Sequence, residues 1–417
     1  MNNKKQLLIL TAIFASTLNA QEEAAPAPTD PDSLTDAIAQ GTVNLDARVR
    51  FETAEQDGLQ DSDAFTGRVR LGYQTGKLYG FQLLTEFEGT TAINDEGDFD
   101  GYPIAAPNTR TVIADPESAE LNRLQLAWQY EDTTVVAGRQ RINLDNSRFV
   151  GNDGWRQNEQ TFDALLILNQ SIEDLTLAYA WVDQVNRIYG ADAPVGALSR
   201  LHANAHLFSV AYPGSSFGTL TAYDYYLDVE NAGLEDASSN TFGVSLAGSL
   251  NLGADDAYTL AYYAEYARQS EAADSTLDFG ADYYHINAIL GRDPFTIGLG
   301  YEVLGSDNGV SVQTPLASLH NFNGFADVFI AIPAGGIEDF YIVGTCDLPK
   351  DCTLSAYYHN FDSEATNLDL GDEFDIVLAC QYNKNWAAIA KYADYSQGDA
   401  GSPASVQRFS LQLDYQY

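Results

Sequence analysis

Residues 409–417 have the sequence FSLQLDYQY, in which apolar or aromatic side chains alternate strictly with polar ones. Successive side chains of a β-strand point to opposite faces of the sheet, so this stretch predicts one apolar and one polar face. The pattern recurs along most of the chain, and no apolar run approaches the ~20 residues of a spanning helix. Strands that are apolar outside and polar inside form the wall of an outer-membrane barrel. We therefore predict an all-β fold, a transmembrane antiparallel β-barrel, in preference to a soluble periplasmic β-protein.

The alternating segments predict about 18 strands. The 377 residues after residue 40 then provide about 21 residues per strand and connection, which suits strands of ~9–11 residues. Short connections, as at 131–132, alternate with long ones, as at 90–120 and 304–337, which predicts short periplasmic turns and long outer loops. The predicted strands are 43–52, 65–74, 81–88, 121–130, 133–142, 162–168, 175–182, 206–212, 218–228, 241–250, 258–267, 279–290, 295–301, 338–346, 353–361, 373–382, 385–395 and 406–417.

The N-terminal region predicts export. Residues 1–20 combine two lysines, a short apolar core and a small residue before Gln21, as in a secretory signal peptide. Residues 21–40 are rich in proline and acidic side chains and predict a mobile periplasmic lead-in, in which Ser33 caps a short helix ending near Gly41. Residues 41–417 form the predicted barrel. We expect the protein in the outer membrane of a Gram-negative bacterium, with outer-membrane lipid as its surroundings.

The overall charge excludes one class of partner. The net charge is -38, and such an excess of acid argues against binding nucleic acid, whose phosphates require basic surfaces. It suits acidic outer loops that face water. The chain also has 25 Tyr and 20 Phe but one Met, which suits a barrel with aromatic girdles at both interfaces.

Arginines recur on the polar face of the predicted strands. An arginine that faces lipid at mid-membrane costs ~2–4 kcal/mol, so eight of them would together exceed the ~5–15 kcal/mol net stability of a typical fold. We therefore expect them to point into the lumen. Because closure makes the last strand a neighbour of the first, they lie on one contiguous arc, formed by Arg48, Arg50, Arg68, Arg70, Arg123, Arg139, Arg141 and Arg408.

Two interpretations of this arc stay open. The arginines could form a cationic track that draws anions through a pore. Alternatively, they neutralise acids of the lumen, such as Asp46, Glu86, Glu88 and Asp163, and hold the wall together. Both could hold at once.

The segment 138–164 is the most distinctive part of the chain, mixing Arg, Asn, Gln and aromatic side chains in the third predicted outer loop. A second long polar-aromatic loop spans 315–340. Together with the signal and the strand count, these loops resemble the alginate-export family of outer-membrane porins over roughly 41–417. The resemblance implies that an anionic polysaccharide or related solutes pass an arginine-lined constriction that contains Arg139, Arg141, Arg148 and Arg156. The chain departs from that family in being far more acidic, with few lysines.

These observations predict a passive, porin-like channel for anionic or sugar-type solutes, and not an enzyme. One alternative is a barrel hydrolase, but only His206 and Ser209 come near a catalytic pair, and a spacing of three places them on opposite faces of a strand. The other is a receptor or adhesive barrel with acidic loops. We expect no cofactor; the acidic stretch 94–101 could attract Ca²⁺ but lacks the spacing of a calcium loop.

Two of the three cysteines flank a predicted turn. Cys346 and Cys352 enclose 347–351 in an oxidising compartment, which favours a disulfide across this hairpin. Cys380 falls in phase with Phe374, Ile376 and Leu378, so we expect it as an apolar side chain on the lipid side.

Overall fold

The structure is a computed structural model that describes residues 31–94, 96–103, 109–254, 257–366 and 368–417. The predicted signal peptide and the first ten residues of the predicted lead-in lie outside the described residues. None of the described helices is long and apolar enough to cross a membrane.

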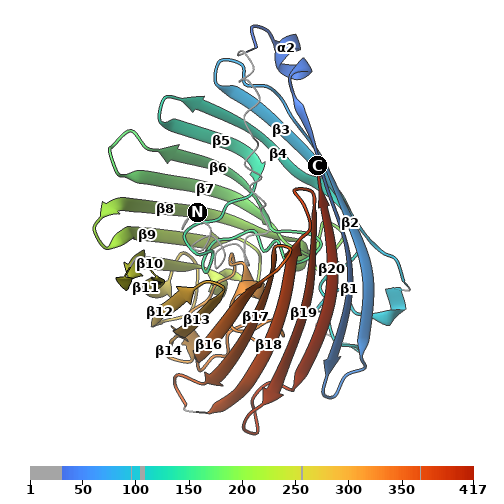
Figure 1. The fold of residues 1–417 in the computed structure, drawn as a ribbon, viewed down its shortest axis with the longest axis vertical. Coiled ribbons are helices and arrows are strands. Elements are labelled where there is room, and N and C mark those ends of the chain that lie inside the picture. Colours follow the sequence, from blue (N-terminus) through green and yellow to red (C-terminus); the bar gives the residue numbers. More distant parts are fainter. Residues whose placement is uncertain (1–30, 95, 104–108, 255–256, 367) are drawn as a thin grey trace.

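The described chain forms one closed barrel of 18 antiparallel strands (Figure 1), as predicted. Each barrel strand pairs with the next along the chain, and β20 pairs with β1 to close the sheet. The first nine strands are β1 (Thr42–Gln56), β2 (Ser62–Gln74), β3 (Phe81–Ala92), β4 (Ser118–Tyr130), β5 (Thr133–Gln140), β6 (Thr161–Asn169), β7 (Thr176–Asn186), β8 (Arg200–Ser215) and β9 (Gly218–Val229). The others are β10 (Ser239–Leu252), β11 (Tyr258–Glu271), β12 (Gly280–Arg292), β13 (Phe295–Leu304), β16 (Ile337–Leu348), β17 (Cys352–Asp362), β18 (Asp369–Gln381), β19 (Trp386–Gln397) and β20 (Val406–Gln416).

Several strand bounds differ from the prediction. β8 begins at Arg200, six residues before the predicted start, because the alternation reverses there: Leu201, Ala203 and Ala205 are buried on the inner face, while His202 points outward. Here the strand has polar side chains outside and packs inward on loops, so the membrane-type pattern is lost. β5 ends at Gln140, which leaves Arg141 in the following loop.

The connections divide the barrel into two ends. Short turns join the strands at one end, which we call the turn end; the longer connections meet at the other, the loop end. The loop end also carries the short hairpin of β14 (Ser306–Asp307) and β15 (Val310–Ser311) and the 3-10 segments Glu96–Asp98, Glu235–Ala237 and Leu319–Asn321, with the helix α3 (Gly196–Ser199). In an outer-membrane barrel the turn end faces the periplasm.

A short helix precedes the barrel at the turn end. This helix, α2 (Leu34–Ala39), is N-capped by Ser33, whose Oγ accepts a hydrogen bond from the Asp36 amide at 3.2 Å. The predicted cap and helix are thereby confirmed.

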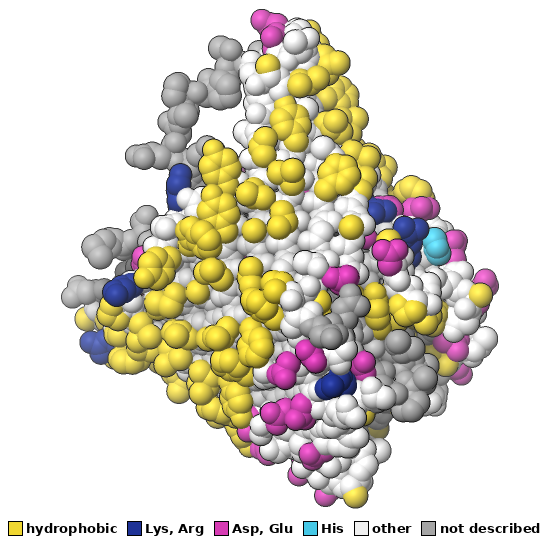
Figure 2. Space-filling model, turned by 90° about the vertical axis from the view of Figure 1, so that its right-hand side faces the viewer, with side chains coloured by type: hydrophobic (Ala, Val, Ile, Leu, Met, Phe, Trp, Pro, Cys, Tyr) yellow, Lys and Arg dark blue, Asp and Glu magenta, His cyan; other side chains and the backbone are white. Residues whose placement is uncertain are grey.

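The barrel wall is apolar outside and polar inside. Val69 and Leu71 are exposed on the outer face, while Arg68 and Arg70, which alternate with them, are buried inside. Figure 2 shows hydrophobic side chains spread over a broad area of one face. Arg48, Arg50, Arg68 and Arg70 therefore face the lumen, as the cost of placing them in lipid predicts. Arg139 on β5, also predicted to face the lumen, instead stands opposite the outward-facing Leu124, and Arg268 on β11 lies exposed on the outer side.

Two connections fold back into the barrel and fill part of its interior. We call the residues 141–160 the first inner loop and 305–336 the second inner loop. They meet where Val150 bridges to Leu316, and the Gly151 amide donates to the Leu316 carbonyl at 2.8 Å. Phe149, Phe325 and Phe329 are buried with them in the main hydrophobic cluster.

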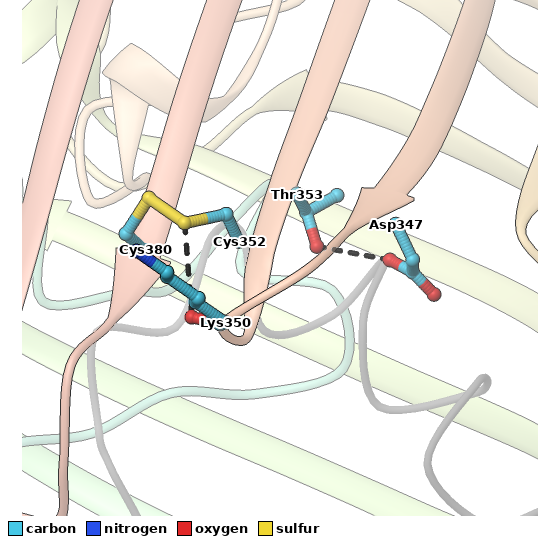
Figure 3. The surroundings of a disulfide bond; sticks show 5 residues. All are labelled: Asp347, Lys350, Cys352, Thr353 and Cys380. Atoms are coloured by element: carbon cyan, nitrogen blue, oxygen red, sulfur yellow. Dashed lines mark hydrogen bonds between the residues drawn. A yellow bond between two sulfur atoms is a disulfide. The ribbon is translucent and has the colours of Figure 1, made fainter.

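The predicted disulfide is wrong in its pairing. Cys352 is bonded to Cys380 (Figure 3). Cys346 is free. The reason is the register of the strands. The turn after β16 places Leu348 opposite Cys352, so Cys346 lies opposite Leu354 and cannot reach Cys352. On the other side of β17, Cys352 lies directly opposite Cys380 of β18. Cys380 is a bridging residue and not the free apolar side chain that we expected.

Candidate channel constriction

A cavity of about 2130 Å³ extends from the turn end to the inner loops. At the turn end it is lined by strand termini, including Thr42, Lys384 and Tyr417. Toward the loop end it meets the first inner loop at Gly154 and the second at Phe322. The inner loops thus narrow the bore at the place where a porin constriction would lie.

Four of the predicted arginines line this cavity: Arg48, Arg70, Arg123 and Arg141. Arg123 donates from Nε and Nη2 to the Glu86 carboxylate at 2.8 and 2.6 Å. Nη2 of Arg141 lies 2.6 Å from Glu159 Oε1. These two arginine side chains are 17 % and 22 % exposed, whereas Glu86 and Glu159 are 5 % and 1 % exposed. All four side chains line the cavity, and the guanidinium groups are the more exposed member of each pair.

Arg48 and Arg70 lie deeper and fasten the first inner loop to the wall. Arg48 Nε donates to Asp414 at 2.7 Å, and its Nη1 donates to the Trp155 carbonyl at 2.9 Å. Arg70 pairs with Glu88 on β3 and lies 3.6 Å from Glu159 of the loop.

The remaining six predicted arginines do not line the cavity. Each forms an ion pair with a carboxylate of the wall or, for Arg50, of the connection between β3 and β4. The pairs are Arg50–Asp115 at 3.2 Å, Arg68–Asp46, Arg139–Asp163 at 2.7 Å, Arg148–Glu302 at 3.0 Å, Arg156–Glu52 at 3.1 Å and Arg408–Glu52 at 3.2 Å. These six arginines therefore connect strands and loops to one another. Among the arginines that line the cavity, Arg123 and Arg141 have the most exposed side chains.

A cluster that the sequence analysis missed joins both inner loops to the wall. Trp155 of the first inner loop lies between Arg50, with Cζ 3.9 Å from the ring centroid, and Lys391, with Nζ 3.7 Å from it. His320 of the second inner loop stacks on the same ring at 4.5 Å between centroids. Lys391 lies in phase with the buried Ala393 and Tyr395 on β19, and this inward position was the available signal.

The burial of His320 determines its protonation state in this cluster. Burial lowers the pKa of His320 to about 3, so its imidazole is neutral at pH 7. Nδ1 lies 2.6 Å from Asp327 Oδ1 and donates to it, which leaves Nε2 to accept from Lys391 Nζ at 2.7 Å. The hydrogen-bonded chain Lys391–His320–Asp327 connects β19 to the second inner loop.

The first inner loop is also fastened across the bore. The Ser245 hydroxyl on β10 donates to Asp145 Oδ2 at 2.5 Å, and Asn146 Nδ2 donates to Glu265 on β11 at 3.3 Å. Burial raises the pKa of the Asp145 carboxyl. The loop therefore spans from the arginine arc to the opposite side of the barrel.

Aromatic and imidazole rings line the cavity on that opposite side. The rings belong to strands β11, β12, β16 and β17, about halfway round the barrel from Arg123 and Arg141. His285 Nε2 is hydrogen-bonded to the Tyr341 hydroxyl at 3.0 Å, and Tyr341 and His359 have ring centroids 5.4 Å apart. The cavity thus has a wall of arginines interspersed with Asp46, Glu86 and Glu159, and an aromatic wall that also carries Glu302 and Asp339.

The described residues contain no group of three or more His, Cys, Asp or Glu side chains arranged to hold a metal ion. Asp95 of the acidic stretch 94–101, considered above for Ca²⁺, lies outside the described residues. Glu96–Asp98 form a 3-10 turn.

Comparison with solved structures gives strong fold matches at low identity. OccAB4 of Acinetobacter baumannii has a TM-score of 0.70 and 14 % identity over 91 % of this chain and 98 % of that one. OpdK of Pseudomonas aeruginosa, solved with vanillate, has a TM-score of 0.70 and 12 % identity over 91 % and 99 %. The chain has the Occ-type barrel fold. OccK3 (OpdO) of P. aeruginosa matches with a TM-score of 0.67 and 16 % identity over 92 % and 97 %.

Sequence comparison does not assign the chain to a family. No protein-family model matches the chain, and no curated protein matches it. The predicted outer-membrane barrel is confirmed, but the resemblance to the alginate-export family is not supported by these matches.

Proposed function

We propose that this protein is an outer-membrane channel through which small anionic solutes diffuse passively. The observation that carries the proposal is the unequal exposure of the Arg123 and Arg141 ion pairs, in which the guanidinium groups are more open to the cavity than the carboxylates that also line it. Charges beside a narrow pore of low dielectric act with little screening and govern which ions enter. This arrangement supports anion selectivity in a chain of net charge -38.

The inner loops support a small solute and not a polymer. They are fixed to opposite walls by the Lys391–His320 contact and by the Ser245–Asp145 hydrogen bond. A polysaccharide chain needs a continuous wide bore, whereas the cavity ends against these loops. The substrate class that we propose is therefore narrower than the anionic polysaccharide implied by the alginate-export resemblance.

The aromatic wall supports a ring-bearing anion. Tyr341, His285 and His359 offer ring faces and edges to a planar or sugar ring, and the arginines opposite could hold its carboxylate. The vanillate of the OpdK structure is an aromatic carboxylate and belongs to this chemical class.

Planar-bilayer recording tests the proposal. The unaltered channel is expected to prefer anions, and Arg123→Gln with Arg141→Gln should reduce the anion-to-cation permeability ratio at least about twofold. Arg268→Gln is the matched control, because Arg268 lies exposed on the outer side and pairs with Asp282 at 3.0 Å.

Two results would refute anion selection by these arginines. One is a cation preference in the unaltered channel. The other is an equal effect of the control and the double substitution.

A further inference from the structure

The helix α2 lies at the turn end of the barrel, beyond the ends of the first strands (Figure 1). The Gly76 amide of the β2–β3 turn donates to the Ala37 carbonyl at 2.8 Å, and Ala37 is buried. The hydroxyl of Tyr73 donates to the Ile38 carbonyl. Tyr73 shares the outward face of β2 with Leu71, so the helix touches the side of the wall that faces lipid.

The chain bends at Gly41 to make this contact. A side chain at position 41 would collide with the Tyr73 hydroxyl and ring. The close approach of Gly41 and Tyr73 therefore fixes where α2 lies relative to the first two strands.

The helix has two chemically different faces. Leu34 and Ile38 are four residues apart and share one face, and they are 67 % and 53 % exposed. At about 100° per residue, Asp36 and Gln40 lie on the opposite face. No described part of the chain covers Leu34 and Ile38.

The apolar belt of the barrel extends to the strand ends and the turn that α2 contacts through Tyr73 and Gly76. Val43, two residues after the bend, is exposed on the outer face of β1, as is Leu71 on β2. Tyr79, in the same turn as Gly76, and Phe81 at the start of β3 are also exposed. Aromatic and apolar side chains at this level of a barrel lie at the membrane interface.

We propose that α2 is an interfacial membrane anchor, lying in the headgroup region of the periplasmic leaflet. Leu34 and Ile38 insert toward the acyl chains, and Asp36 and Gln40 face the periplasm. The occupant of this apolar face is lipid, because the helix contacts the end of the apolar belt that lipid already covers. Residues 34–39, predicted as part of a mobile lead-in, are then held at the membrane beside the barrel.

Site-specific fluorescence tests this anchor. In a Cys346→Ser background, which removes the free thiol, Ile38→Cys and Asp36→Cys are each labelled with the environment-sensitive fluorophore NBD. The full chain is reconstituted in phosphatidylcholine vesicles with or without spin-labelled lipid. Heat-modifiable migration on gels confirms that each variant is folded. Val69→Cys, on the outer belt, is the positive control for contact with lipid.

The label at position 38 is expected to emit at shorter wavelength and to be quenched by spin-labelled lipid at least twofold more than the label at 36. Aqueous iodide should show the reverse order. Equal quenching at 36 and 38 would overturn the proposal. So would a label at 38 that stays exposed in vesicles and becomes shielded only when periplasmic extract is added, since a protein would then cover the helix.

Discussion

The Lys391 ammonium lies 2.7 Å from Nε2 of His320 and 3.7 Å from the centre of the Trp155 ring, so one wall side chain contacts both inner loops. Its strand, β19, is fixed in the barrel by eleven residue pairs with β18. Lys391 therefore connects both inner loops to a strand of the barrel wall.

Replacing this lysine should loosen the inner loops. Lys391→Met keeps most of the side-chain volume but removes a charged hydrogen bond worth ~1.5–3 kcal/mol. We expect about a tenfold or greater shift toward undocked loop states, seen as added current fluctuation in single-channel recordings. Lys77→Met, at an exposed turn position, should leave the fluctuations unchanged. Identical traces for both variants would show that Lys391 does not hold the loops.

Asp153 should make stability dependent on pH. Burial, together with the nearby Asp327 carboxylate, raises the pKa of Asp153 to about 7, against ~3.9 in an unfolded chain. The folded state therefore binds this proton more tightly, and the stability that the group contributes at low pH is lost as the pH rises from about 4 to about 7. Asp153→Asn should raise the unfolding temperature at pH 8 and change it little at pH 4.

The control for this substitution is Asp274→Asn, at an exposed position of an outer loop. Asn also tolerates the positive φ of 44° at position 153. A gain at pH 8 that persists undiminished at pH 4 would contradict ionisation as the cause.

The cysteine pairing can be checked by digestion without reduction. Trypsin cuts after Lys350 and Lys384, so Cys352 and Cys380 remain in one peptide while Cys346 falls in the peptide before it. We expect alkylation of the unreduced protein to modify Cys346 alone, and the peptide 351–384 to carry an internal disulfide. Two tryptic peptides joined through Cys346 would support the hairpin pairing instead.

Membrane topology can be probed with inserted tags. A tag after Gly233, which lies in an exposed connection with open space around it, should be reachable by antibody on intact cells. A tag after Lys350, at a short turn, should be reachable only after the outer membrane is permeabilised. The opposite labelling would invert the assigned ends. Insertions at 315–330 are unsuitable, because the second inner loop is packed inside the barrel.

The sequence predicted the parts of the molecule that are governed by contact with lipid. Val69 and Leu71 alternate with Arg68 and Arg70 because one face meets lipid and the other meets the lumen, and this contrast gave the strand count. Where a strand leaves the membrane the contrast vanishes, as at Leu201, and the start of β8 was misplaced there.

The candidate site was only partly predictable. The inward direction of the arginines followed from the cost of placing them in lipid, but their partners depend on how the inner loops fold. Arg141 meets Glu159 through a loop contact, and Lys391 meets His320 across 71 residues. The Cys352–Cys380 bond could not be predicted, because it depends on the register of the paired strands. The turns set that register, and their geometry could not be derived from the sequence.

The side chains at the β1–β20 junction also favour one register of pairing between these two strands. Arg48 stands opposite Asp414 and Arg50 opposite Gln412, and both arginines are buried. A slip of two residues in one direction would place Asp414 opposite Asp46 and leave Arg48 opposite Gln412, so that a buried cation would lose its partner while two carboxylates met. This junction can form only when the first and last strands are both present, so these charges favour the correct register when the barrel closes. A barrel that closed in a shifted register would be destabilised by its buried, unpaired charges.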